Sequence, residues 1–174
     1  MVGDSLPVSV FADHADGQFE QGASAYEKRG SSVMVPEWDE TKCIQCNRCS
    51  YVCPHAVIRP FVMNDEELKN APEATKATKM LGKGTEGMHF SIAISPMDCT
   101  GCGSCANVCP APNKALVMKP MLEQMDQQEI FNATAYSVTE KDMGPLTVVS
   151  AQFKQPLLEF SGACGAAARL LTQN

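Results

Sequence analysis

Residues 43–54 read Cys-Ile-Gln-Cys-Asn-Arg-Cys-Ser-Tyr-Val-Cys-Pro, and the same spacing of cysteines and proline returns at residues 99–110. Both runs have the form Cys-x2-Cys-x2-Cys-x3-Cys-Pro. Together they use eight of the nine cysteines in the 174-residue chain. Two copies of one cysteine run indicate a duplicated metal-binding unit, and this repeat decides the fold.

The spacing is typical of bacterial ferredoxins that hold a pair of [4Fe–4S] clusters. In such runs the first three cysteines hold one cluster, and the fourth, followed by proline, reaches the other cluster. The sequence therefore predicts a cluster I held by Cys43, Cys46, Cys49 and Cys109, and a cluster II held by Cys99, Cys102, Cys105 and Cys53. A chain with two such clusters is expected to carry electrons.

Two other uses of the cysteines fit less well. A structural zinc site takes four ligands, usually arranged as two pairs, whereas each run here has a triplet and one outlying cysteine. Disulfides need an oxidising compartment, but residues 1–20 have no basic n-region followed by an apolar stretch like that of a secretory signal. Metal binding in a reducing, cytoplasmic environment is the expectation.

Composition agrees with an acidic electron carrier. The formal charge is −6 and the sequence pI is about 5.0, which argues against nucleic acid as a partner because its phosphates demand basic patches. An acidic surface suits steered association with a basic partner. No apolar run approaches the roughly 18 residues of a transmembrane helix.

The repeat predicts an α+β fold, a ferredoxin-like domain with pseudo-two-fold symmetry. We expect it at residues 36–120, with short helices at residues 47–52 and 106–108 and strands at residues 56–60, 91–94 and 115–118. Ile44, Val52, Val57, Val108 and Leu116 are expected to keep water from the iron, while glycines 101 and 103 allow backbone N–H groups to approach the sulfurs.

An insert at about residues 63–87 separates the two halves. Residues 65–68 and 74–81 favour short helices, broken by Pro72. The insert ends in Gly82-Lys-Gly84-Thr-Glu-Gly87, which has the residue pattern Gly-x-Gly-x-x-Gly of a dinucleotide-binding fingerprint. Such a fingerprint must follow a strand and open a helix, and here the order is reversed. A loop is predicted.

The segments before and after the domain contain fewer informative sequence patterns. Residues 1–35 hold too few apolar side chains for a core, so an extended N-terminal arm is expected to lie over something larger. Its charged Glu27-Lys28-Arg29 is expected to be a solvated turn. Residues 121–174 form a C-terminal extension, or tail.

Several segments resemble pyruvate:ferredoxin (flavodoxin) oxidoreductase. They are Leu-Pro-Val-Ser at residues 6–9, Tyr-Glu-Lys-Arg at 26–29, Trp-Asp at 38–39, Ile-Gln-Cys-Asn at 44–47, and residues 153–164. In that family a long multidomain chain decarboxylates pyruvate on thiamine diphosphate, makes acetyl-CoA and passes the electrons out. The resemblance implies that this chain is the inserted two-cluster domain, with the EKR-type segment before it and the start of the thiamine domain after it.

The chain departs from that family near its C-terminus. The family has a second cysteine three residues after its Gly-Ala-Cys, at a third cluster beside the thiamine, but here Ala167 follows Cys164 at that distance. The thiamine site, the CoA site and the third cluster therefore do not carry over, and Cys164 is not expected to be a ligand.

The leading hypothesis is an electron-transfer module of a 2-oxoacid oxidoreductase. It would relay electrons from a thiamine diphosphate domain or subunit to an external ferredoxin or flavodoxin, and it would not be catalytic alone. A free-standing diffusible ferredoxin and a subunit whose clusters only brace the fold are the alternatives. The long flanks weigh against the former, and crossed ligands, which bring two clusters close together, weigh against the latter.

Overall fold

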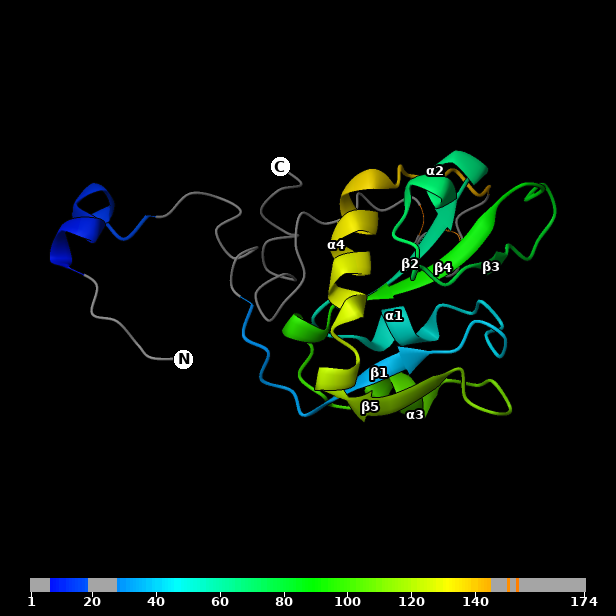
Figure 1. Ribbon diagram of the computed structural model, residues 1–174, viewed down its shortest axis with the longest axis horizontal. Coiled ribbons are helices and arrows are strands. Elements are labelled where there is room, and N and C mark those ends of the chain that lie inside the picture. The colour runs from blue at the N-terminus through cyan, green and yellow to red at the C-terminus, as the bar shows by residue number, and fades with distance from the viewer. Residues whose placement is uncertain (1–6, 19–27, 145–149, 151–152, 154–174) are drawn as a thin grey trace.

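The computed structural model describes residues 7–18, 28–144, 150 and 153. Two small antiparallel sheets form its body (Figure 1). In one, β1 (Met34–Trp38) pairs with β5 (Leu116–Pro120); in the other, β4 (His89–Ile94) lies between β2 (Ile58–Met63) and β3 (Thr78–Lys79). The predicted mixture of helices and strands is confirmed.

The two halves of the repeat interlock through their strands. Each half runs strand, cysteine loop, short helix, strand: β1, α1 (Arg48–Val52) and β2 in the first, and β4, α3 (Ser104–Val108) and β5 in the second. The entering strand of each half pairs with the leaving strand of the other, with Trp38 opposite Leu116 and Ile94 opposite Ile58. This exchange places the two cysteine loops side by side. The helices and strands predicted within the two halves are present, with ends shifted by a few residues.

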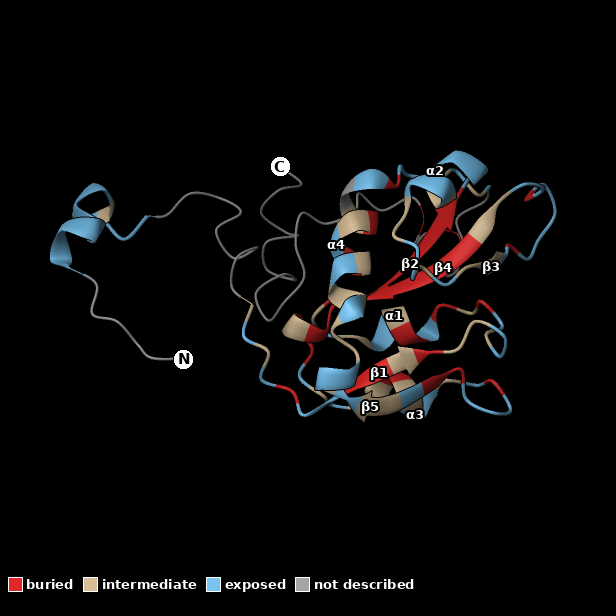
Figure 2. Cartoon of the chain, viewed as in Figure 1, coloured by how far each residue is buried: buried red, intermediate tan, exposed pale blue. Residues whose placement is uncertain are grey.

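The second sheet forms the centre of the core. All six residues of β2 are buried, and α4 (Asp126–Ser137) packs against β4 (Figure 2). Arg59 is among these buried residues. Its guanidinium lies 5.3 Å from the ring centre of Phe131 on α4, and its Nε donates a hydrogen bond to the carbonyl of Ala56. The cation is thereby tolerated inside, because a ring face and a carbonyl replace water.

The insert agrees with the prediction in part. Its first helix is α2 (Asp65–Asn70), which begins with a capping box between Asn64 and Glu67. The second predicted helix, at residues 74–81, is wrong. A turn closed by the Thr75 N–H on the Pro72 carbonyl leads instead into β3, because pairing with the exposed edge of β4 satisfies this backbone. Residues 82–87 form the predicted loop.

The flanks add contacts to the body. The 3-10 helix η1 (Val8–His14) has no buried residue, whereas Lys28 forms an ion pair with buried Asp98. The expectation that Lys28 belongs to a solvated turn is therefore wrong. In the C-terminal extension Lys141 forms an ion pair with Glu67 of the insert. The predicted boundaries at residues 35–36 and 120–121 stay predictions, and Cys164 lies outside the described residues.

None of the helices in the described part of the chain has the length and apolar character needed to cross a membrane.

Candidate iron–sulfur centre

The two cysteine loops repeat one backbone conformation. Gln45 and Asn47 in the first loop have φ of 56°, and the corresponding Gly101 and Gly103 have φ of 70° and 72°. A positive φ is uncommon outside glycine, so its return at both positions of both loops marks a conformation that the site requires. In both loops the third cysteine, Cys49 or Cys105, is buried.

Backbone N–H groups point at the sulfurs in both loops. The amide of Gln45 lies 3.4 Å from Cys43 Sγ, and that of Gly101 lies 3.3 Å from Cys99 Sγ. A third amide, that of Ala115, lies 3.4 Å from Cys109 Sγ. Donors aimed at sulfur stabilise negative charge there, which is one way in which a protein raises the potential of a cluster.

One group of four cysteines surrounds a small cavity between the loops. Cys53, from the end of α1, lines it together with Cys99, Cys102 and Cys105 of the second loop. Burial raises the pKa of the Cys105 thiol to about 11, with further contributions from the charges of Cys53, Cys99 and Cys102. Burial also raises the pKa of Cys99. These four are the cysteines predicted to hold cluster II.

The remaining four cysteines influence one another in the same way. Burial raises the pKa of Cys43, and the charges of Cys46 and Cys109 raise it further, which places Cys109 beside the first loop. Burial raises the pKa of Cys49 to about 12, with Cys43 and Cys46 again contributing. The fourth cysteine of the second run thus contributes to the pKa of a cysteine in the first run; that Cys43, Cys46, Cys49 and Cys109 hold cluster I stays a prediction.

The two groups lie next to each other. Helices α1 and α3, which carry Cys49 and Cys105, pack together, and the charge of Cys105 contributes to the raised pKa of Cys49. In Figure 1 α1 lies between the two sheets, and α3 lies behind β1 and β5. An electron on one group would have a short path to the other.

The site fits the cationic iron–sulfide core of a cluster better than four free thiols. Four thiols with raised pKa values, three of them buried, would stay protonated at neutral pH, but ligation to iron replaces the proton by positive charge. The indole of Trp38 also fits a cluster bound at Cys43. Its buried Nε1 has no hydrogen-bonding partner among the described residues, yet it lowers the pKa of Cys43, so it lies beside that sulfur. A thiolate bound to a cluster would accept a hydrogen bond from this N–H.

The exposure of the apolar side chains around the loops is uneven. Val57 and Leu116 are buried, as expected of residues that keep water from the iron. Ile44, Val52 and Val108 are 50%, 36% and 38% exposed, so the expectation for these three is wrong. They lie in the first loop and at the ends of α1 and α3, where only the cysteine-bearing side faces inward. His55 lines the cavity around Cys53 and is half-buried.

Sequence reasoning did not identify the side chains that support the loops from outside them. Trp38 was noticed only as part of a resemblance, although an aromatic N–H donor five residues before a ligand is a recognisable signal. Gln45 holds the first loop to the insert, donating to the carbonyl of Lys79 and accepting from the amide of Leu81, at 2.8 Å each. Such a long-range amide pair leaves no trace in local sequence.

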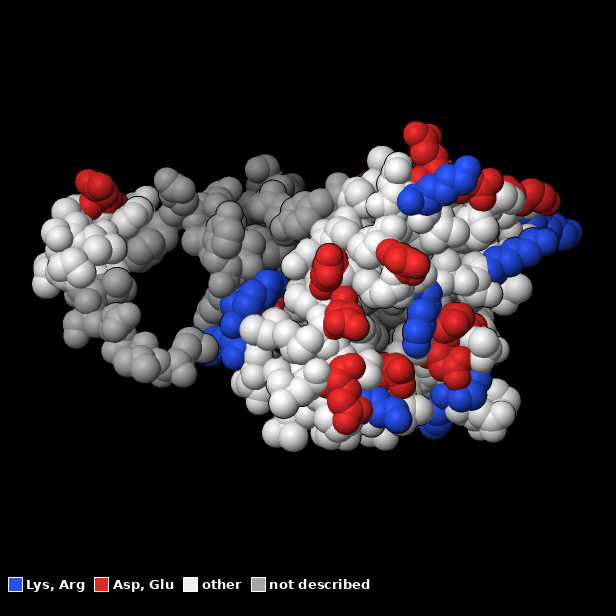
Figure 3. All heavy atoms as spheres, viewed as in Figure 1, with Lys and Arg blue, Asp and Glu red and all other residues white. Residues whose placement is uncertain are grey.

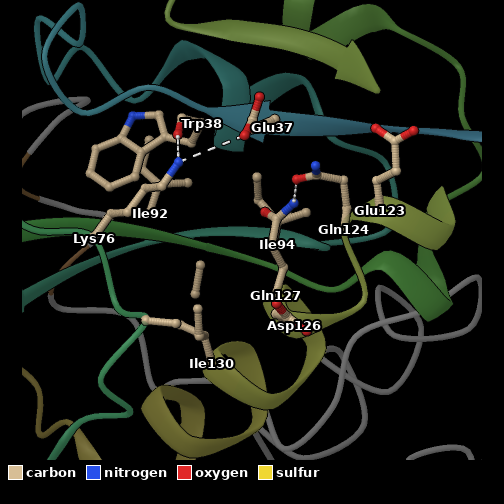
Figure 4. A pocket seen from close by; sticks show the side chains of 12 residues that line it. Glu37, Trp38, Lys76, Ile92, Ile94, Glu123, Gln124, Asp126, Gln127 and Ile130 are labelled. Carbon is tan, nitrogen blue, oxygen red and sulfur yellow. Dashed lines mark hydrogen bonds and ion pairs between the residues drawn. The ribbon is translucent and has the colours of Figure 1, made fainter. Parts of the chain in front are cut away.

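A separate pocket lies between the sheets and α4 (Figure 4). Lys76 Nζ reaches the Trp38 carbonyl at 3.3 Å and Glu37 at 3.8 Å, while Gln127 donates to Gln124 at 2.7 Å. No cysteine lines this pocket, so it is not part of the candidate centre.

On the face that Figure 3 shows, acidic and basic side chains are interspersed over the body.

Comparison with known proteins supports this picture. The family described as a 4Fe-4S dicluster domain matches residues 42–113, which contain both cysteine runs. A second family, EKR, described as a domain of unknown function, matches residues 1–32. The match to the dicluster family indicates two [4Fe–4S] clusters, as predicted.

Relatives similar to this chain extend far beyond it. "Pyruvate-flavodoxin oxidoreductase" of Enterobacter agglomerans is 49% identical over 98% of this chain and 15% of its own length. "Pyruvate:ferredoxin oxidoreductase" of Moorella thermoacetica is 49% identical over 93% of this chain and 14% of its own length. "Pyruvate dehydrogenase [NADP(+)], mitochondrial" of Euglena gracilis is 40% identical over 93% of this chain and 9% of its own length. The chain therefore spans about 15% or less of these relatives.

Proposed function

We propose that this chain, which over nearly its whole length is similar to one segment of pyruvate:flavodoxin and pyruvate:ferredoxin oxidoreductases, is an electron-transfer module. It passes electrons through two adjacent [4Fe–4S] clusters from a thiamine diphosphate domain or subunit to a ferredoxin or flavodoxin. The substrate is an electron, and the module itself makes and breaks no carbon bond.

The grouping of the cysteines is the observation that carries the proposal. Cys53 lines one cavity with the cysteines of the second loop, while the charge of Cys109 contributes to the raised pKa of Cys43 in the first loop. Crossed sets of this kind bring two clusters close together, as a relay requires and a brace for the fold does not. Cluster I would be held by Cys43, Cys46, Cys49 and Cys109, and cluster II by Cys99, Cys102, Cys105 and Cys53.

The residues around each set would hold the clusters in complementary ways. Amide N–H groups and the indole of Trp38 stabilise charge on the sulfurs, while Val57 and Leu116 exclude water. The clusters supply the electron-accepting iron. The protein fixes how far apart they lie and at which potential each one works.

Metal content and ligand exchange test the proposal directly. Anaerobically purified protein is expected to contain about eight iron and eight sulfide per chain, because the spacing provides for two four-iron clusters. Cys109→Ala should damage the cluster of the first loop, and Cys53→Ala that of the second, since each opens one iron in the opposite set. Two zinc ions and no iron would contradict the cofactor, and damage confined to the variant's own loop would contradict the crossed ligands.

Turnover tests the role as a relay. The purified chain should transfer electrons from a chemical reductant to ferredoxin or flavodoxin, but it should not reduce an acceptor dye when given pyruvate, CoA and thiamine diphosphate. Dye reduction above a protein-free control would contradict the role. The same assay with the thiamine-containing part of the enzyme added should restore pyruvate-dependent reduction.

A further inference from the structure

Residues 28–33 run from the N-terminal side across the second cysteine loop and into β1; we call them the strap. In Figure 1 they form the blue segment that passes the 3-10 turn η3 (Pro96–Asp98) before β1. The Gly30 amide donates to the Met97 carbonyl at 2.8 Å, and the Val33 carbonyl accepts from the Met121 amide at 2.9 Å. The strap is thus bound to the body at both ends.

An ion pair also joins the strap to η3. Lys28 Nζ lies 2.5 Å from Asp98 Oδ2, and the side chain of Asp98 is only 1% exposed whereas that of Lys28 is 27% exposed. Asp98 directly precedes Cys99 and also accepts from the Ser95 hydroxyl at 2.6 Å. A buried carboxylate needs such partners, because removing one leaves an uncompensated charge inside the protein.

The strap also touches the second loop itself. Ser32 is buried, and a Cβ added at Gly101 would lie 2.5 Å from its Oγ and 3.0 Å from the Met34 carbonyl. This explains why glycine stands at position 101, whereas Gln45 takes the corresponding place in the first loop, which the insert covers instead. The two loops share one conformation, but only the second lies under the strap.

From these contacts we infer that the strap neutralises the buried carboxylate of Asp98 beside cluster II, with Lys28 as its positioning residue, and thereby keeps the potential of this cluster above the value it would have without Lys28. The inference rests on the proposed function, since it requires that Cys99 is a ligand of that cluster. It also gives a role to the end of the segment that matches a domain of unknown function. The pair is neutral when intact, so cluster II gains or loses a neighbouring charge only when one partner is removed.

Charge substitutions at the pair test the inference in the whole protein. Lys28→Gln leaves a negative charge beside cluster II and should lower its reduction potential, because reduction adds further negative charge. Asp98→Asn leaves a positive charge and should raise it. In each case a tenfold change in the reduction equilibrium corresponds to about 59 mV for a one-electron couple. The double variant should return close to the wild-type value.

Redox titration followed by paramagnetic resonance at pH 8 gives both midpoint potentials. Lys69→Gln on α2 is the matched control, because it removes the same charge from an exposed position far from α3 in Figure 1. Hydrogen exchange at the Gly30 amide supplies a second readout and should be faster in Lys28→Gln. Shifts of the same sign in both single variants, or no shift in either, would overturn the inference; a protein without iron would instead overturn the proposed function.

Discussion

Replacing Trp38 by phenylalanine should lower the potential of cluster I and leave cluster II nearly unchanged. Trp38 is 3% exposed and stands five residues before Cys43, where its indole N–H lowers the pKa of that thiol. The corresponding residue before Cys99 is Ile94, which has no side-chain donor. The substitution therefore removes a donor that only one half of the repeat possesses.

The magnitude follows from the hydrogen bond that the Trp38 indole would donate to the Cys43 thiolate when that sulfur is bound to cluster I. Hydrogen bonds to charged groups contribute about 1.5–3 kcal/mol, and the part that favours the reduced over the oxidised cluster is a fraction of this, about 1 kcal/mol. With about 59 mV for each tenfold change, or 1.4 kcal/mol, in a one-electron equilibrium, the potential of cluster I should fall by roughly 40 mV. The smaller ring should also lower the free energy of unfolding by about 1–3 kcal/mol.

Redox titration of the two clusters measures the shift. Phe90→Leu provides the control, because Phe90 packs edge-on against Trp38 with ring centres 6.0 Å apart, so its loss disturbs the packing and keeps the N–H. The reasoning is refuted if Phe90→Leu reproduces the shift, or if Trp38→Phe moves both potentials equally. The variant also assigns the potentials, since the strap substitutions should move the other one.

Two further substitutions test the contacts that hold the loops and the flanks. Gly101→Ala should lower the free energy of unfolding by about 2–4 kcal/mol, because the added Cβ would crowd Ser32 and the backbone there is left-handed. Gly103→Ala should lower it by only about 1–2 kcal/mol, because a Cβ added there has no atom within 4 Å and only the left-handed strain remains. Equal losses in urea unfolding would argue against the close approach. At Glu67 burial disfavours the charge, but hydrogen bonds from Lys141 and the neighbouring backbone outweigh it and lower the pKa from 4.5 to about 2. Glu67→Gln should therefore reduce stability by about 1–2 kcal/mol above pH 4.5, and the difference should vanish as the pH falls from 4.5 towards 2; a difference independent of pH would contradict this.

The cysteine repeat predicted the parts of the fold that depend on spacing. The short helices that carry the third cysteines and the strands that follow the fourth agree with it, because the backbone must return from each cysteine loop to a sheet. The helix predicted at residues 74–81 failed for a physical reason. Its local sequence allows a helix, but the open edge of β4 offers hydrogen bonds that an isolated short helix could not match.

The candidate ligands were predictable, whereas the groups that distinguish the two halves were not. Cysteine spacing is a local property, and the chain shows it twice. Lys28 and Asp98 are 70 residues apart, and Gln45 contacts a backbone 34 residues away. Such contacts exist only after the sheets have formed, so a charged run in the N-terminal arm could not be told from an exposed turn.

A relay of two clusters needs a difference between them as well as a short distance. The repeat alone would give both halves the same amide donors, and the structure does place corresponding amides at Cys43 and Cys99. What breaks the symmetry lies outside the repeat: the indole of Trp38 at the first half, and the strap with its Lys28–Asp98 pair at the second. If the indole raises the potential of cluster I while Lys28 only cancels the charge of Asp98 beside cluster II, the difference between the two potentials is determined by residues next to the repeated motif, while the motif itself determines only that two clusters are held.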